Sequence, residues 1–597
     1  MYVYALSKKA QVNDTGGAII MPTLEWIGKE KVINHHQQVP YRVLEEKYTY
    51  NAERSDNMII RGDNLEALKA LLPQFEGKVK CIYIDPPYNT GNEGWVYNDN
   101  VGDPKIKKWL GEVVGKEGED LSRHDKWLCM MYPRLKLLQK LLAEDGVIFI
   151  SIDDTEYANL KLICDEIFGS NCFVSNISWQ RTYSTRNDSK GIVNEVEHLL
   201  VYSKQPDWNP NKLPRTEEMN SKYKNPDNDR TLWRTDNAFA PGAATHQGMV
   251  YAIQHPFTGK MLYPSNGACW RYQQDLMLEI MRGWCDYELR DLNDTHERAV
   301  VCGVADEDVR QGVQAIVLSE PLDVAAKKAQ AVYERGQWPR FFFTKGGKGG
   351  IARKTYLENV GGKLPTNFWP FSETGHTDEA KKEMLAIFDG KATFDTPKPR
   401  RLLEYVLKVA GSEDALILDS FAGSGTTAHA VLNMNKADGG HRKFILVEMM
   451  DYADSITAER VKRVIDGYGE GKNAVVGTGG DFTFYDLGEV LLLPDGNLNE
   501  KVAAGKIREY VYYMETKEAL PGSSNGNAYF MGNSRGTAYY FYYEKASITT
   551  LNHAFLATIP EKSEGYIIYA DLCTIPPEEL AKYNITFKKI PRDIAKL

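Results

Sequence analysis

Short apolar runs alternate with amphipathic segments over much of the chain. The apolar runs predict buried strands, which lie at 58–60, 79–84, 146–152, 173–179, 198–202, 415–419 and 443–448. Apolar residues at helical spacing predict helices at 64–75, 132–142, 156–168, 380–388, 401–409, 426–432 and 456–465. This alternation of strands and helices indicates an α/β fold with a largely parallel sheet.

The pattern divides the chain into five regions. Two of them, 57–204 and 361–475, carry the α/β alternation and are expected to be halves of one domain. Residues 1–56 are mixed and predict a lead-in that packs on this domain. In residues 205–360 the periodicity weakens while Gly, Pro, Asn, Arg and aromatic residues increase, which predicts an inserted domain that faces the substrate. Residues 476–597 contain aromatic strands and predict a C-terminal α+β domain that contacts a second copy or a partner.

The strand predicted at 79–84 ends in the string D-P-P-Y, from Asp85 to Tyr88. Pro86 and Pro87 stop the strand because neither has an N–H to give to a neighbouring strand. Asp85 and Tyr88 are therefore held on a stiff loop at the carboxyl end of a strand, where open α/β sheets bind ligands. A carboxylate, the Pro86 carbonyl and a flat ring suit the binding of a planar amine. An ordinary turn is the competing interpretation of D-P-P alone, and the longer string Y-I-D-P-P-Y-N-T-G favours a site.

A second loop joins the strand predicted at 415–419 to the helix at 426–432. Its residues are Phe421, Ala422, Gly423, Ser424, Gly425 and Thr426. The two glycines allow positive φ and close backbone approach to a ligand. Glu448 ends the next predicted strand, about 20 residues on, which is the spacing of an acid that binds ribose hydroxyls. Position 428 is alanine, so the loop fits only the G/A form of the dinucleotide fingerprint. Both a dinucleotide and a different ribose-containing ligand therefore remain candidates for this loop.

Together the two motifs resemble amino-methyltransferases, which methylate exocyclic nitrogens in DNA. D-P-P-Y comes before F-A-G-S-G, which is the β order of that family, with a target-recognition domain between the catalytic and cofactor halves. Further strings resemble the Mod subunits of type III restriction–modification systems: D-P-P-Y-N-T-G, I-F-I-S-I-D-D, E-H-L-L-V-Y, G-H-T-D-E-A-K-K-E and T-P-K-P. The resemblance implies a Rossmann-like methyltransferase sheet that uses S-adenosylmethionine.

The resemblance also implies the reaction, which is methylation of adenine N6 in duplex DNA after base flipping. Asp85, Pro86, Pro87 and Tyr88 would be catalytic, with Asp85 and the Pro86 carbonyl accepting the N6 hydrogens and Tyr88 stacking on the base. The loop from Phe421 to Thr426 would hold the cofactor with Glu448, Asp63 and Lys398; for Asp63, helix capping competes with this role. N4-cytosine methylation, a solitary adenine methyltransferase and a catalytically silent DNA-recognition subunit are the alternatives.

Double-stranded DNA, a second copy of the chain and a separate helicase–nuclease restriction subunit are the implied partners. The candidates for phosphate contact are Arg181, Arg186, Lys345, Lys348, Arg353 and Lys354, for which a solvated charged surface is the competing interpretation. No Walker A motif is present, so we expect ATPase activity on another chain.

Composition and charge bear on the partners of the protein and on its cellular compartment. The net charge of −9 disfavours DNA binding by the whole surface but is compatible with a basic cleft. Eight scattered cysteines without a C-x-x-C pair indicate reduced thiols and no metal site. No apolar run reaches the roughly 18 residues of a membrane span. We therefore expect a cytoplasmic protein without a metal.

Overall fold

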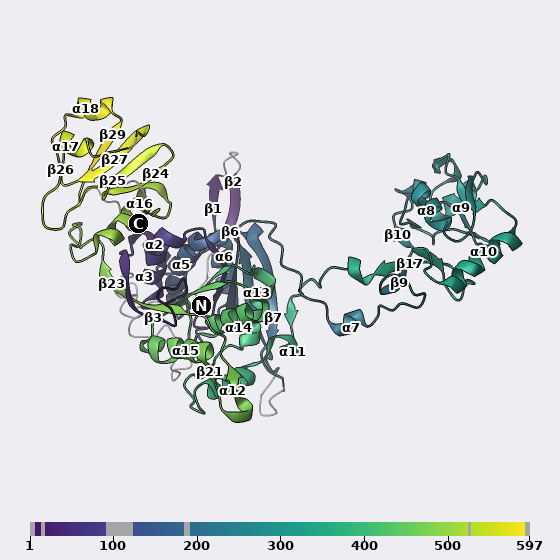
Figure 1. Ribbon diagram of the computed structural model, residues 1–597, viewed down its shortest axis with the longest axis horizontal. Helices are drawn as coiled ribbons and strands as arrows, with labels where there is room; N and C mark the ends of the chain where they lie inside the picture. Colours follow the sequence, from purple (N-terminus) through teal and green to yellow (C-terminus); the bar gives the residue numbers. More distant parts are fainter. Residues whose placement is uncertain are drawn as a thin grey trace. The chain divides into compact units, whose positions relative to one another are not determined.

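The computed structural model describes residues 6–12, 18–90, 123–183, 192–522, 527–560 and 562–590. The chain forms two compact units, of which the first combines Met1–Asn211 with Pro365–Leu597 and the second is Lys212–Leu364 (Figure 1). The second unit begins and ends within a few residues of the expected insertion at 205–360. Each unit has a hydrophobic core of its own.

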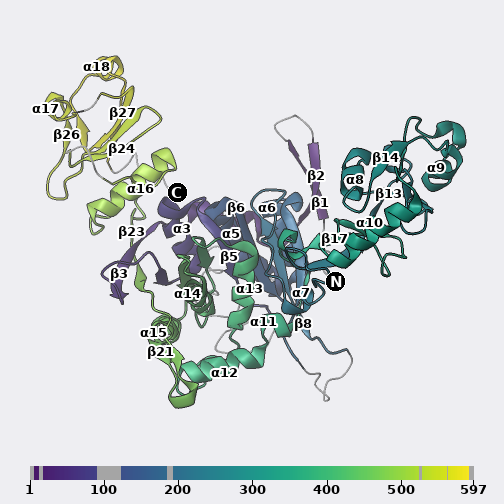
Figure 2. The same cartoon turned by 45° about the vertical axis from the view of Figure 1, so that its right-hand side comes forward.

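A ten-stranded sheet forms the centre of the first unit (Figure 2). In spatial order its strands are β18 (Phe368–Trp369), β7 (Phe173–Gln180), β8 (Val196–Ser203), β6 (Leu142–Ile152), β5 (Val79–Ile84), β19 (Leu416–Asp419), β20 (Lys443–Glu448), β4 (Met58–Arg61), β23 (Phe482–Val490) and β3 (Arg42–Tyr50). Of these ten strands, β8 and β3 run antiparallel to their neighbours and the rest share one direction. The expected α/β class with a largely parallel sheet is confirmed.

Amphipathic helices connect these strands. They are α3 (Asn64–Phe75), α5 (Arg123–Leu141), α6 (Tyr157–Phe168), α12 (Thr377–Ile387), α13 (Arg400–Ala410), α14 (Thr426–Asp438) and α15 (Glu459–Asp466). The helix expected to start at Tyr132 begins nine residues earlier, and Pro133 lies inside it rather than in its first turn. Burial of the segment from Trp127 to Met131 explains the longer helix, because these side chains join the core under the sheet.

The chain order reverses between β5 and β19, which are parallel neighbours. From β5 the chain continues through α5 to β6 on one side, and from β19 it continues through α14 to β20 on the other. Such a switch point leaves a crevice at the carboxyl ends of the strands. The D-P-P-Y loop follows β5 and the glycine loop follows β19, so both motifs emerge at this crevice.

The second unit has a core rich in tryptophan, with Trp233, Trp270 and Trp284 fully or almost fully buried. One sheet contains β12 (Met261–Leu262), β11 (Ile253–Gln254), β15 (Ala315–Leu318) and β14 (Tyr287–Arg290), and a second contains β16 (Phe341–Phe343), β17 (Ile351–Tyr356) and β9 (Trp233–Asn237). Its longer helices are α8 (Gln274–Met281), α9 (Thr295–Cys302) and α10 (Leu322–Arg335).

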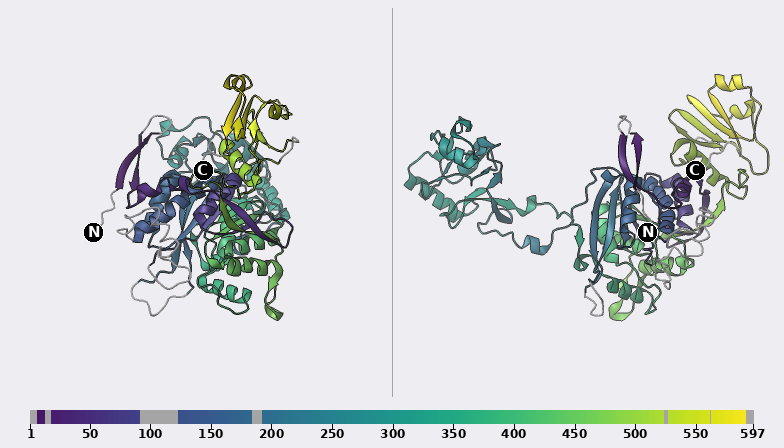
Figure 3. Two further views of the ribbon diagram at one scale, coloured as in Figure 1. Left: turned by 90° about the vertical axis from the view of Figure 1, so that its left-hand side faces the viewer. Right: turned by 180° about the vertical axis from the view of Figure 1, so that it is seen from behind.

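The C-terminal region adds α16 (Ala504–Thr516) and a four-stranded sheet of β24 (Phe530–Ser534), β25 (Thr537–Phe541), β27 (Gly565–Ala570) and β29 (Ile585–Lys589) (Figure 3). The strand β25 contains three consecutive aromatic residues, from Tyr539 to Phe541. Its side chains alternate between two cores: Tyr539 and Phe541 pack on one face, and Ala538 and Tyr540 on the other. This two-sided burial explains the run of aromatic residues.

Lys354 lies inside the second unit, with 0% of its side chain exposed. Its ammonium donates to Asp227, to Asp229 at 2.6 Å and to the Trp338 carbonyl at 2.7 Å. A lysine with these buried partners does not reach a DNA phosphate. The expected phosphate contact is therefore wrong for Lys354, whose charge instead balances two aspartates within the core.

We predict that Lys354→Ala destabilises the second unit by about 3–5 kcal/mol, because it leaves buried carboxylates without their cation. The exposed Lys345 is the matched control, and Lys345→Ala should change the free energy of unfolding by less than about 0.5 kcal/mol. Chemical denaturation of the full chain, followed by tryptophan fluorescence, measures both. Equal effects of the two substitutions would contradict the structural role of Lys354.

Candidate active site

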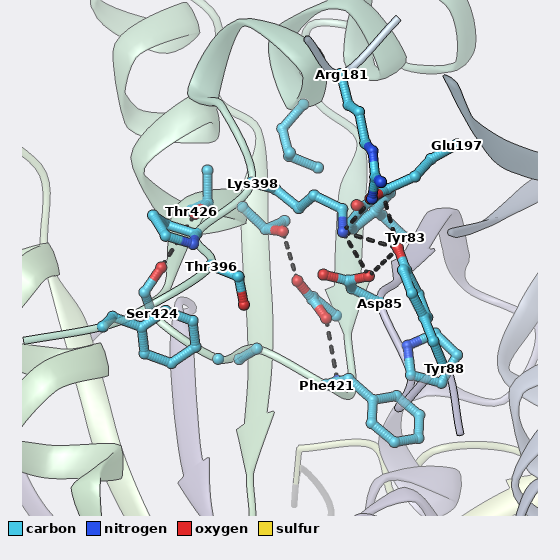
Figure 4. A pocket seen from close by; sticks show the side chains of 18 of the residues that line it. Tyr83, Asp85, Tyr88, Arg181, Glu197, Thr396, Lys398, Phe421, Ser424 and Thr426 are labelled. Atoms are coloured by element: carbon cyan, nitrogen blue, oxygen red, sulfur yellow. Dashed lines mark hydrogen bonds and ion pairs between the residues drawn. The ribbon is translucent and has the colours of Figure 1, made fainter. Parts of the chain in front are cut away.

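A cavity of about 300 Å³ lies where β5 and β19 end (Figure 4). Asp85, Pro86 and Tyr88 line one part of it, and the glycine loop from Phe421 to Thr426, except Gly425, lines another. Arg181, Glu197 and the segment that contains Phe394, Thr396, Pro397 and Lys398 also line the cavity. Two motifs that lie in separate halves of the sequence are thus brought to one cavity.

The D-P-P-Y loop is fixed from behind by α5 and α6. Trp127 donates its indole N–H to the Pro87 carbonyl at 2.6 Å. Asn89 has a φ of 60° and donates its amide to Glu156, which is fully buried. The Glu156 carboxylate also accepts from Asn159 at 2.7 Å. Trp127 and Glu156 were not singled out from the sequence, because nothing in their own neighbourhood shows that they reach this loop.

Four charged groups and a phenol meet beside this loop. Lys398 Nζ donates to Asp85 Oδ1 at 2.9 Å and to the Tyr88 hydroxyl at 2.8 Å, and it lies 3.4 Å from Glu197 Oε2. Tyr88 donates to Asp85 Oδ1 at 2.9 Å, and Arg181 Nη1 lies 2.9 Å from Glu197 Oε1. Glu197 stands in the quoted string E-H-L-L-V-Y but had no predicted role. It reaches the site because β8 is antiparallel, so that its first residues lie at the carboxyl edge of the other strands.

The backbone of the glycine loop requires glycine at two positions. Gly423 has a φ of 52° and Gly425 a φ of 80°, which side chains rarely tolerate. A Cβ at Gly425 would lie 3.1 Å from the Thr457 carbonyl oxygen. Arg460 is fully buried behind the loop and donates to Ser424 Oγ at 2.8 Å and Thr426 Oγ1 at 2.7 Å. The guanidinium fixes both hydroxyls, a support that the sequence motif did not reveal.

Two buried carboxylates flank the glycine loop. Asp419 lines the cavity and accepts from the Phe421 amide at 3.0 Å and the Thr427 hydroxyl at 2.5 Å. Glu448 accepts from the Gly423 amide at 2.8 Å and the Met450 amide at 2.9 Å, and it is not among the residues that line the cavity. Burial raises the pKa of Asp419 and that of Glu448 each to about 7.

Asp63 caps a helix in this structure. Its Oδ1 accepts from the Leu65 amide at 2.8 Å at the start of α3, and its Oδ2 lies 3.1 Å from Arg134 Nη2. Asp63 does not line the cavity, so the capping alternative describes its contacts, while a contact with the cofactor stays a prediction.

The cations predicted to contact phosphate have different surroundings. Arg181 lines the cavity, Lys345 and Lys348 are exposed, and Arg353 is partly buried with Nη2 2.7 Å from Asp236 Oδ2. Arg186 lies outside the described residues. Lys345 and Lys348 are therefore the two candidates of the second unit that are exposed to solvent.

Sequence comparison assigns the chain to a family. The DNA methylase model, N6_N4_Mtase, matches residues 79–459, which contain both motifs. The chain belongs to the DNA methylase family. The chain is 32% identical to the type III restriction-modification enzyme StyLTI Mod subunit of Salmonella typhimurium, over 74% of this chain and 62% of that one.

Two further relatives belong to different types of restriction–modification enzyme. The type III restriction-modification enzyme EcoPI Mod subunit of Escherichia phage P1 is 30% identical, over 71% of this chain and 63% of its own. The type II methyltransferase M.KpnI of Klebsiella pneumoniae is 30% identical, over 66% of this chain and 81% of its own. The chain thus spans less than two thirds of the length of either Mod subunit. The resemblance to the amino-methyltransferases of DNA and to Mod subunits is confirmed.

Two observations on the described residues concern membrane spans and metal sites. Within the described ranges, no helix is long and apolar enough to cross a membrane. The same part of the chain contains no group of three or more His, Cys, Asp or Glu residues placed to hold a metal ion.

The raised pKa of Asp419 leads to a prediction about stability. Folding raises this pKa from an ordinary 3.8 to about 7, so the folded state binds the proton more tightly than the unfolded state. The resulting stabilisation is complete below the unfolded pKa and is lost as the pH rises through about 7. We expect the free energy of unfolding of the wild type, minus that of Asp419→Asn, to fall between about pH 4 and about pH 7.

Denaturant titrations of both proteins at several pH values measure this difference, with Asp414→Asn, a substitution at an exposed aspartate, as the control. Profiles of wild type and Asp419→Asn that stay parallel across the range would show that this carboxyl titrates normally.

Proposed function

We propose that this DNA methylase transfers a methyl group from S-adenosylmethionine to adenine N6 in duplex DNA. The observation that carries the proposal is the single cavity at the β5–β19 switch point, lined by both the D-P-P-Y loop and the glycine loop. One loop holds a carboxylate and an aromatic ring suited to a planar amine, and the other has the backbone form suited to a small ligand. Their shared cavity lets the two substrates meet.

The cavity fits the methyl donor in its chemistry. S-adenosylmethionine supplies an electrophilic methyl group on a positively charged sulfur. Asp419 places a buried carboxylate in the wall beside the glycine loop, and the Phe421 side chain adds apolar surface. The Thr90 hydroxyl, which also lines the cavity, is buried and has no hydrogen-bond partner within the described part of the chain. These groups would hold a cationic ligand that also offers polar atoms.

Asp85 and Tyr88 would hold the target base. N6 is paired inside the duplex, so the base must leave the stack before these residues can reach it. Asp85 and the Pro86 carbonyl would accept the two N6 hydrogens, which turns the nitrogen lone pair toward the methyl group and stabilises positive charge developing on N6. Tyr88 would stack on the flipped ring. The N6 nitrogen would form a bond to the methyl carbon while the bond from that carbon to sulfur breaks, which leaves the electron pair on sulfur as a neutral thioether. N6 would then release one proton to solvent, so the main contribution of the protein is alignment.

Adenine is proposed over cytosine because the acid at the first position of D-P-P-Y resembles the adenine enzymes. N4-cytosine methylation uses the same amine geometry and is the alternative. Incubation of unmethylated DNA with the protein and labelled cofactor, followed by digestion and mass spectrometry, separates N6-methyladenine from N4-methylcytosine. Detection of N4-methylcytosine alone would overturn the adenine proposal.

We predict that Asp85→Ala lowers the methylation rate by at least about 100-fold, because it removes an acceptor that acts on charge developing in the transition state. Cofactor affinity, measured by calorimetry, should stay close to that of the wild type, since the glycine loop and Asp419 are unchanged. Asp145→Ala removes an exposed carboxylate and is the matched control, expected to leave the rate unchanged. Full activity of Asp85→Ala would overturn the assignment.

The 205–360 insertion, which corresponds closely to the second unit, is proposed to read the DNA site, and the whole chain to be the modification and recognition subunit of a type III system. The similarity to two Mod subunits supports this proposal. A second copy of the chain and a restriction subunit with helicase and nuclease activity would be its partners, with the 476–597 region as a contact surface.

A solitary methyltransferase is the second candidate, favoured by the similarity to M.KpnI over 81% of that enzyme. Co-purification of the chain with the product of a neighbouring helicase–nuclease gene would distinguish them.

The exposed lysines of the second unit lead to a salt prediction. If Lys345 and Lys348 contact phosphates, the double substitution to Gln should weaken DNA binding and reduce the dependence of log K on log salt concentration by about 2. Fluorescence anisotropy with mixed-sequence DNA at several salt concentrations gives this slope. Lys328→Gln, at a lysine paired with Asp286 and Glu320, is the control. An unchanged slope would remove both lysines from the interface.

A further inference from the structure

Positive and negative groups alternate in a row that starts at Asp85. Lys398 lies 2.9 Å from Asp85 Oδ1 and 3.4 Å from Glu197 Oε2, and Arg181 lies 2.9 Å from Glu197 Oε1 (Figure 4). The two groups in the middle are well buried, with 13% of the Lys398 side chain and 9% of the Glu197 side chain exposed. Two carboxylates therefore compete for one lysine, and Arg181 compensates the outer one.

The contacts of Asp85 are unequal between its two oxygens. Lys398 and the Tyr88 hydroxyl both donate to Oδ1, whereas no described donor contacts Oδ2. Two donors on one oxygen fix the rotation of the carboxylate and leave the second oxygen available. Since Asp85 lines the cavity, the available oxygen is the natural acceptor for an incoming N–H group.

The usefulness of this acceptor depends on its charge. A protonated carboxyl would present an O–H toward an amine that itself donates, and it would not stabilise positive charge on nitrogen. Burial raises the pKa of Asp85, the Lys398 ammonium opposes this effect, and the Glu197 carboxylate adds to it. Glu197 itself is held charged: burial raises its pKa, but Lys398 and Arg181 outweigh burial and lower it.

We propose that Lys398 and Glu197 are positioning residues that act on the target amine through Asp85. Lys398 holds Oδ1 together with Tyr88 and keeps the carboxylate charged, so that Oδ2 accepts the N6 hydrogen. Glu197 shares the lysine and weakens its hold on Asp85. The proposal rests on the proposed amine methylation and differs from the expected role of Lys398 at the methionine end of the cofactor.

Other titratable groups face Asp85 from the neighbouring strands. Tyr83 comes from β5, Asp153 follows β6, and Asp419 ends β19. Tyr83 is neutral at ordinary pH, since burial raises its pKa well above the usual value. The Glu197 carboxylate raises the pKa of Asp85 as a like charge, and the Asp85 carboxylate contributes in the same way to the raised pKa of Asp419, which is due mainly to burial. In the described part of the chain, Lys398 is the cation in contact with Asp85. Its removal should therefore raise the pH at which Asp85 becomes charged.

The test compares wild type with Lys398→Met, Lys398→Arg and the double variant Lys398→Met/Glu197→Gln. The transfer of tritiated methyl groups to unmethylated mixed-sequence DNA is measured at saturating cofactor across a range of pH. Without the ammonium, the acid side of the rate profile should move to higher pH, so Lys398→Met loses more rate at low pH than at high pH. Removing the Glu197 charge as well should move the profile back toward lower pH and restore part of the low-pH rate. Lys398→Arg keeps the cation and should keep the profile of the wild type.

A purely structural role for Lys398 gives a different result. Damage to packing would lower the rate by the same factor at every pH, and the second substitution would lower it further rather than restore it. Either of these results would overturn the proposal, as would a shifted profile in Lys398→Arg.

A second measurement separates this inference from the proposed function. If the wild type labels no DNA, the proposed function fails, and the charge state of Asp85 is read from stability instead. For each protein, the free energy of unfolding is compared with that of the same protein carrying Asp85→Asn, as a function of pH. The pH at which this difference changes should be higher for Lys398→Met than for the wild type. In the double variant it should be lower again than in Lys398→Met. Identical dependences in all proteins would overturn the inference.

Discussion

The parallel pairing of β5 with β19 joins two halves of the sheet that are far apart in the chain. Ile417 pairs with Cys81 and Leu418 with Ile82, all four fully buried. Because the strands run in the same direction, their carboxyl ends meet, and the loops that follow them face a common crevice. The cavity, the contacts between its walls and the proposed meeting of cofactor and base all depend on this register.

Burial at the crevice determines the chemistry of its charged groups. Carboxylates at Asp85, Asp419 and Glu448 lie among the ends of apolar strands, where water stabilises a charge poorly. Each is compensated in a different way: Asp85 by Lys398, Glu448 by backbone amides, and Asp419 by a backbone amide and a hydroxyl. Of the three, Asp419 lines the cavity without a cation within hydrogen-bond distance in the described structure, which makes it complementary to a positively charged ligand.

Both units contain a buried cation with polar partners. Lys354 balances two aspartates in the second unit, and Arg460 supports the hydroxyls of the glycine loop in the first. Burying a cation is costly unless its partners are well placed. Each of these side chains therefore has a structural task, and counting cations along a segment does not show which of them face a nucleic acid.

The sequence by itself determined the α/β class, the positions of most strands and the two loops that line the cavity. Periodicity, proline and glycine act over a few residues, so Asp85, Tyr88 and the Phe421–Thr426 loop were recognisable without coordinates. The roles of Glu197, Trp127 and Arg460 and the burial of Lys354 are not visible in the sequence, because their partners lie between 16 and 201 residues away. Only the tertiary structure decided which strands pair, which charges are buried and which carboxylate each cation reaches, since these depend on long-range packing that no local pattern encodes.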